Sequence, residues 1–146
     1  MNYLILAWMV LATTAVAAAP QPEPYCKRLP FDDEVPAGLI GKYDIVGRNS
    51  ATAGPYSGTL RIEPGKDSYI LTRTVQGRVR KGEAWVEVCS PDKFQRLMVR
   101  LDSKPRAIEF ACYLRGDGDN FVRASCTTAD ARGLEAWFQR HDALAP

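Results

Sequence analysis

The regular spacing of turn-forming residues is the feature that most constrains how this chain can fold. From Lys42 onward, short runs of β-favouring residues are separated by Gly, Pro, Asp and Ser about every 8 to 12 residues, the spacing expected of an all-β sandwich or barrel. We therefore predict a mainly β fold, an antiparallel meander of about seven strands closed or nearly closed into a small barrel.

The expected strands follow from the runs and their alternation. They cover 41–48, 57–62, 68–75, 78–88, 95–101, 107–114 and 120–126. In the run 95–101, Leu97, Val99 and Leu101 alternate with longer or charged side chains and predict an inward aliphatic face. Gln76-Gly77 predicts a tight hairpin in which glycine supplies a positive φ.

The last segment has a different period. Leu134, Trp137 and Phe138 fall at positions i, i+3 and i+4, and Thr128 is a suitable N-cap residue. This pattern predicts a C-terminal α-helix over 129–141 that packs on the sheet.

The first residues have the pattern of an export signal. Leu4 to Ala12 form an apolar run that is shorter than the roughly 20 residues needed to span a bilayer. Ala15-Val16-Ala17 matches the A-x-A pattern of a cleavage site. We expect a signal peptide at 1–17, a proline-rich arm at 18–37 and a single barrel domain with its C-terminal helix at 38–146. No stable membrane insertion is expected after cleavage.

Four cysteines follow this leader, and an even set in an exported chain predicts two disulfides and a secreted or periplasmic location. If the last hairpin closes near Leu114 and Asn120, Cys112 faces Val122 rather than Cys126. This register favours the pairs Cys26–Cys126 and Cys89–Cys112. The sequence alone leaves all three connectivities open.

Few residues have the pattern of a catalytic or metal site. His141 is the single histidine and no serine or cysteine motif accompanies it. The segment 116–120 resembles the start of a calcium loop, but no Glu follows at the twelfth position, so a polar turn is favoured. The acidic residues 32–34 are expected to be solvated. We predict no catalytic residue, metal or cofactor, and a protein that is not an enzyme.

Two groups of side chains are candidates for binding. Arg73, Arg78, Arg80 and Lys81 cluster on one hairpin, and if the sheet registers align they form, with arginines of neighbouring strands, an outer basic stripe able to bind an acidic protein or anionic polymer. Those neighbouring arginines are Arg61, Arg96, Arg100 and Arg123. An ordinary charged exterior is the favoured interpretation of these residues. The net charge of +2 gives no indication of nucleic-acid binding.

The second group consists of aromatic residues that either line a cavity or fill the core: Tyr43, Tyr56, Tyr69, Trp85, Phe110, Tyr113 and Trp137. The residues nominated for ligand or partner contact from the two groups are Tyr43, Tyr56, Trp85, Arg73, Arg78 and Arg80.

Gly41-Lys42-Tyr43, Gly47, the segment 56–62 and Tyr69-Ile70-Leu71 resemble the first hairpins of calycin barrels, the lipocalins and avidins. In those families a Gly-x-Trp near the first strand packs its ring across the barrel end, and the resemblance implies that Tyr43 takes that place. It also implies a ligand-binding barrel followed by a helix. More loosely, the chain is similar to small exported bacterial proteins that include lysozyme inhibitors.

These observations lead to an expected function. We expect a secreted or periplasmic, monomeric, non-enzymatic binding protein of the calycin-like type, with a small apolar ligand or a protein partner. The alternative is an inhibitor of a secreted or host enzyme, such as a lysozyme or protease, that presents a loop at 49–56 or 115–120.

Overall fold

The computed structural model describes residues 25–32, 36–49, 54–116 and 122–140. Its nine strands are β1 (Cys26–Arg28), β2 (Gly41–Arg48), β3 (Pro55–Pro64), β4 (Tyr69–Val75), β5 (Arg78–Cys89), β6 (Phe94–Leu101), β7 (Ile108–Gly116), β8 (Val122–Thr128) and β9 (Leu134–Gln139).

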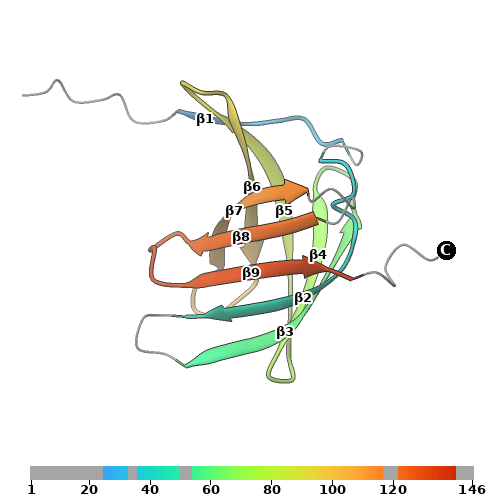
Figure 1. Cartoon of the computed structure of the whole chain (residues 1–146), viewed down its shortest axis with the longest axis vertical. Helices are drawn as coiled ribbons and strands as arrows, with labels where there is room; N and C mark the ends of the chain where they lie inside the picture. The colour runs from blue at the N-terminus through green and yellow to red at the C-terminus, as the bar shows by residue number, and fades with distance from the viewer. Residues whose placement is uncertain (1–24, 33–35, 50–53, 117–121, 141–146) are drawn as a thin grey trace, which may run out of the picture.

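Strands β2 to β9 form a closed antiparallel barrel (Figure 1). Each strand pairs with the next one in sequence, and β9 pairs with β2 to close the cylinder. This is the up-and-down arrangement, in which closure leaves no free edge on the barrel strands. The expected antiparallel meander is therefore present as an eight-stranded barrel.

The alternation of side chains explains the core. In β2, Tyr43 and Ile45 are completely buried, whereas the residues between and beside them are exposed. The same alternation buries Leu97, Val99 and Leu101 of β6, as the sequence predicts. The expected turn at Gln76-Gly77 is also present, and both residues have positive φ.

The predicted C-terminal helix is wrong: residues 134–139 form strand β9, and no helix occurs in the described part of the chain. Leu134 and Phe138 point outward and are 42% and 43% exposed, whereas Glu135 and Trp137 point into the barrel. Because a charged residue occupies an inward position, the apolar residues fall on both faces and imitate a helical period. No described helix is long and apolar enough to cross a membrane.

Both disulfides join residues that lie directly opposite each other on paired strands. Cys26 of β1 bonds to Cys89 of β5, and Cys112 of β7 bonds to Cys126 of β8. The predicted pairing Cys26–Cys126 and Cys89–Cys112 is wrong because the β7–β8 hairpin closes two residues later on each strand than predicted, with Gly116 opposite Val122 and Cys112 opposite Cys126. Two disulfides are consistent with an oxidising, extracellular environment. The predicted leader lies outside the described residues.

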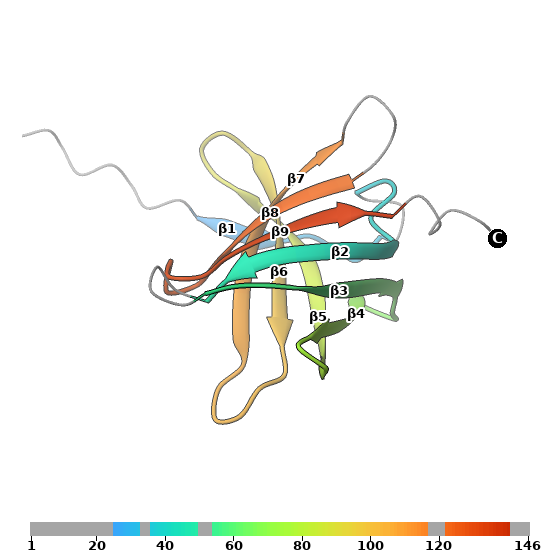
Figure 2. The same cartoon turned by 60° about the horizontal axis from the view of Figure 1, so that its bottom comes forward.

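The two ends of the barrel differ (Figure 2). The N-terminal arm covers one end: β1 pairs with the last residues of β5, and Phe31 packs edge-on against Tyr69, 5.1 Å between ring centroids. The Tyr69 hydroxyl donates to the Asp32 carbonyl. The turn between β4 and β5 and the loop between β6 and β7 lie at the opposite end, which is called the mouth below.

Candidate functional site at the barrel mouth

Three arginines from β4 and β5 face the inside of the barrel at its mouth. Arg73 lies two residues beyond Leu71, a fully buried inward position, and is itself 7% exposed. Arg80 is its direct partner across the β4–β5 pair, and Arg78 is the partner of Val75. The strand register therefore turns all three side chains toward one cavity.

This cavity has a volume of about 580 Å³. It is lined by Asn49, Gly54, Tyr56, Arg73, Val75, Gln76, Arg78, Arg80, Arg106, Ala107, Ile108, Glu109, Phe110, Thr128, Ala129 and Asp130. Its size lies within the range of small-molecule sites. The mouth is thus hollow, whereas aromatic and aliphatic side chains fill the barrel beyond it.

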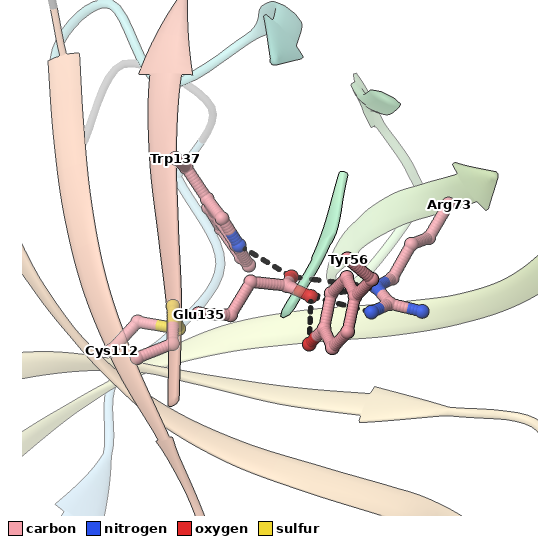
Figure 3. The surroundings of a disulfide bond; sticks show 6 residues. Tyr56, Arg73, Cys112, Glu135 and Trp137 are labelled. Carbon is pink, nitrogen blue, oxygen red and sulfur yellow. Dashed lines mark hydrogen bonds and ion pairs between the residues drawn. A yellow bond between two sulfur atoms is a disulfide. The ribbon is translucent and has the colours of Figure 1, made fainter. Parts of the chain in front are cut away.

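At the bottom of the cavity Arg73 forms a buried ion pair with Glu135 of β9 (Figure 3). The Arg73 Nε donates to Glu135 Oε2 at 3.0 Å, and its Nη2 donates to the same oxygen. The Tyr56 hydroxyl donates to Oε2 at 2.8 Å, and the Trp137 indole donates to Oε1 at 2.7 Å. The carboxylate therefore accepts hydrogen bonds at both oxygens from three side chains, and it fixes the position of the Arg73 guanidinium.

Gly47 of β2 makes room for this cluster. It is the direct strand partner of both Tyr56 and Glu135. A Cβ atom at this position would lie 2.6 Å from the Tyr56 hydroxyl oxygen and 2.6 Å from the Leu134 carbonyl oxygen. The missing side chain lets the Tyr56 ring lie across β2 and reach the carboxylate of β9. Arg73 is stacked on the same ring, with 5.2 Å between its Cζ and the ring centroid.

The surroundings of Tyr56 and Asp130 change their ionisation. Burial raises the pKa of the Tyr56 hydroxyl above its ordinary value, and the negative charge of Glu135 raises it further. Tyr56 therefore remains a neutral donor to the carboxylate. At the rim, the Thr128 hydroxyl and the Arg132 amide donate to Asp130, and these bonds lower the pKa of its carboxyl group. Asp130 is thus ionised, and its carboxylate already accepts hydrogen bonds from residues of its own turn.

The positive charges of the mouth exceed the carboxylates available to them. Glu135 neutralises Arg73, but among the described side chains Arg80 donates only to the neutral Ser103 hydroxyl. Arg78 and Arg106 have no hydrogen bond or ion pair within the described residues. Glu109 points to the outside, where Arg100 is 3.9 Å away. Arg73 and Arg80 are direct partners across β4 and β5, and like charges at such positions repel. An anion bound between them would reduce this repulsion.

Four of the six nominated contact residues, Tyr56, Arg73, Arg78 and Arg80, lie on this one cavity. Tyr43 instead belongs to the core and donates to the Leu39 carbonyl. Trp85 lies on the outside of β5, where it donates to Glu87 and stacks under Arg28 at 5.0 Å. Sequence reasoning missed Glu135 and Arg106. A carboxylate inside an otherwise apolar final run was the available signal for Glu135.

The described residues do not form a single basic stripe on the outside of the barrel, because the arginines concerned lie on two different faces. Arg73, Arg78 and Arg80 point inward, whereas their expected companions lie on the exterior. Among those companions, Arg61 pairs with Glu63 and Arg96 pairs with Glu87. His141, residues 117–120 and most of the two loops proposed for enzyme inhibition lie outside the described residues.

One group of described residues brings together metal-ligating atom types: Cys26, Glu87 and Cys89. Cys26 and Cys89 are bonded to each other. Because cysteine ligates metals as a thiolate, this group is not a metal site in the oxidised protein.

No protein-family model matches the sequence, and no curated protein matches it. A solved structure described as the de novo design of a fluorescence-activating β-barrel has a similar fold, with a TM-score of 0.50 and 19% sequence identity. The match covers 76% of this chain and 100% of the designed chain. At this identity the similarity concerns the fold alone, and the chain is a closed β-barrel.

Proposed function

We propose that this protein is an exported, non-enzymatic binding protein of the calycin-like type that takes an anionic ligand or an anionic group of a partner in the mouth of its barrel. The observation that carries this proposal is the convergence of Arg78, Arg80 and Arg106 on one cavity, where none of them has a carboxylate partner among the residues that the structure describes. A concave surface with excess positive charge concentrates anions and increases their rate of association.

The arrangement of Arg73 supports binding with defined geometry. Its Nε and Nη2 are held by Glu135, and its guanidinium is stacked on Tyr56. A guanidinium held in one orientation loses less conformational entropy when it binds an anion than a free side chain does. Arg80 is similarly oriented by Ser103. We infer that these two arginines recognise the anion and that Arg78 and Arg106, at the exposed rim, attract it.

The bonding of Glu135 favours binding over acid–base catalysis. A general base needs an oxygen that is free to accept the substrate proton, whereas both Glu135 oxygens already accept bonds from protein donors. The carboxylates at the rim do not face one another across the cavity: Asp130 is bound to its own turn, and Glu109 faces Arg100.

Calorimetric titration with three anions, 1-naphthoate, acetate and sulfate, at low and high salt tests the proposal. At least one of them should bind, and its affinity should fall as salt screens the charges. The double variant Arg78→Gln/Arg80→Gln should weaken binding at least about tenfold, since one charge-assisted bond is worth about 1.5–3 kcal/mol.

The matched control is Arg61→Gln/Arg115→Gln, which removes the same charge from exposed positions on the outside of β3 and β7. It should change the affinity by less than about twofold, the effect expected of distant screened charges. Equal losses in both double variants, or no binding of any of the three anions, would overturn the proposed function.

A further inference from the structure

The mouth has two chemically different walls. The arginines come from β4, β5 and the loop before β7, where Arg73, Arg78, Arg80 and Arg106 line the cavity. Another part of the lining comes from the residue before β7, the beginning of β7 and the turn after β8. Beside the polar Glu109, Thr128 and Asp130, it offers the apolar residues Ala107, Ile108, Phe110 and Ala129. A cavity built only for a hydrated inorganic anion does not need an apolar wall.

This apolar wall is held firmly in place. Phe110 is 3% exposed and is the direct strand partner of Val99 on one side and Thr128 on the other. Ile108 packs against the barrel core but remains partly exposed. Part of the Ile108 side chain is therefore available to a ligand, whereas the Phe110 ring provides a fixed surface behind it.

The bottom of the cavity limits how far a ligand enters. The Arg73–Glu135 pair and Tyr56 close it, and beyond them Trp137 fills the barrel with 1% exposure. A long aliphatic chain therefore has no channel along the barrel axis, and a charged pair at the bottom is a poor contact for an apolar tail. A compact ligand with its anionic group toward the arginines fits this shape.

From these observations we infer that the mouth binds a compact amphiphilic organic acid, with its anionic group on the arginine wall and its apolar body against Ile108 and Phe110. This inference rests on the proposed function and adds the class of the ligand and its orientation. A bicyclic aromatic carboxylate such as 1-naphthoate is the probe.

The same titrations separate this inference from the function on which it rests. The protein should bind 1-naphthoate at least about tenfold more tightly than acetate or sulfate, because burying about 60 Å² of apolar surface is enough for that ratio. Ile108→Asn should weaken 1-naphthoate binding several-fold and leave acetate and sulfate binding unchanged, whereas Arg78→Gln/Arg80→Gln should weaken all three.

Ile70→Asn is the matched control, because Ile70 is 47% exposed on the outer face of β4. Ile108→Thr, a smaller change at the same position, keeps the test valid if Ile108→Asn does not fold, as checked by circular dichroism. If acetate or sulfate binds as tightly as 1-naphthoate, and neither Ile108 variant selectively weakens 1-naphthoate, the ligand class is wrong although the anion site stands. If the arginine variants have no effect, the proposed function itself fails.

Discussion

Replacement of Glu135 by glutamine tests whether the buried ion pair organises the mouth. Glu135 is 3% exposed and accepts bonds from Arg73, Tyr56 and Trp137. Glutamine has the same shape but only one acceptor oxygen. Whichever way its amide turns, the NH₂ group faces a donor: Trp137 in one orientation, and Tyr56 with Arg73 in the other.

The expected loss is large because Arg73 then remains buried without a counter-charge. Removing one member of a buried ion pair costs about 3–5 kcal/mol, a considerable part of the 5–15 kcal/mol by which a typical domain is stable. With an m value of about 2 kcal/mol/M, a loss of about 4 kcal/mol lowers the urea midpoint by about 2 M. Equilibrium unfolding followed by far-UV circular dichroism measures this shift.

Two comparisons make the result specific. Glu63→Gln breaks an ion pair with Arg61 whose side chains are 45% and 59% exposed, and it should cost at most about 1 kcal/mol. The double variant Arg73→Met/Glu135→Leu removes both buried charges and should be more stable than Glu135→Gln alone. The reasoning is refuted if Glu135→Gln costs no more than Glu63→Gln.

Three further predictions concern stability. Gly47→Ala should destabilise the fold by about 1–3 kcal/mol in urea unfolding, because the added methyl group would overlap the Tyr56 hydroxyl; unchanged stability would contradict this packing. Cys26→Ser/Cys89→Ser should lose up to about 4 kcal/mol, since the bond closes a loop with a sequence separation of 63; equal stability with and without the bond would contradict that contribution. In an alkaline titration followed by ultraviolet absorbance, Tyr56, with its raised pKa, should ionise only above the ordinary range of a tyrosine, and the free energy of unfolding should fall as pH rises above about 10; a Tyr56→Phe variant that removes a group ionising within the ordinary range would contradict it.

The strands could be predicted because their inward positions are apolar. In β2 and β6 the alternation is clear, and the predicted bounds agree with the structure to within one residue. β9 could not be recognised in this way. Glu135 is a charged residue at an inward position, so the alternation of apolar inward residues with polar outward residues is interrupted. Its carboxylate is acceptable inside the barrel only because Arg73, which is 62 residues away in the sequence, lies opposite it.

The positions of the disulfides and of the candidate site depend on which residues of neighbouring strands lie opposite each other. Local sequence patterns specify this register poorly. A hairpin that closes two residues later on each strand places Cys112 opposite Cys126 instead of Val122. The arginines Arg73, Arg78 and Arg80 lie on one cavity, but on the inward face of the sheet and not on the outer face that a basic stripe requires. Tyr69, Leu71 and Arg73 alternate in the sequence, so the inward direction of Arg73 could have been inferred from its own strand.

Nuclear magnetic resonance of the tryptophan indoles tests the anion-binding mouth most directly. Trp137 donates its indole N–H to Glu135 beneath the mouth, whereas Trp85 donates to Glu87 on the outside of β5. During titration with 1-naphthoate, the Trp137 indole resonance and the Arg73 and Arg80 Nε–H resonances should shift together, while the Trp85 indole resonance stays in place. A shift of Trp85 with no change at Trp137 and the two arginines would contradict a binding site at the mouth.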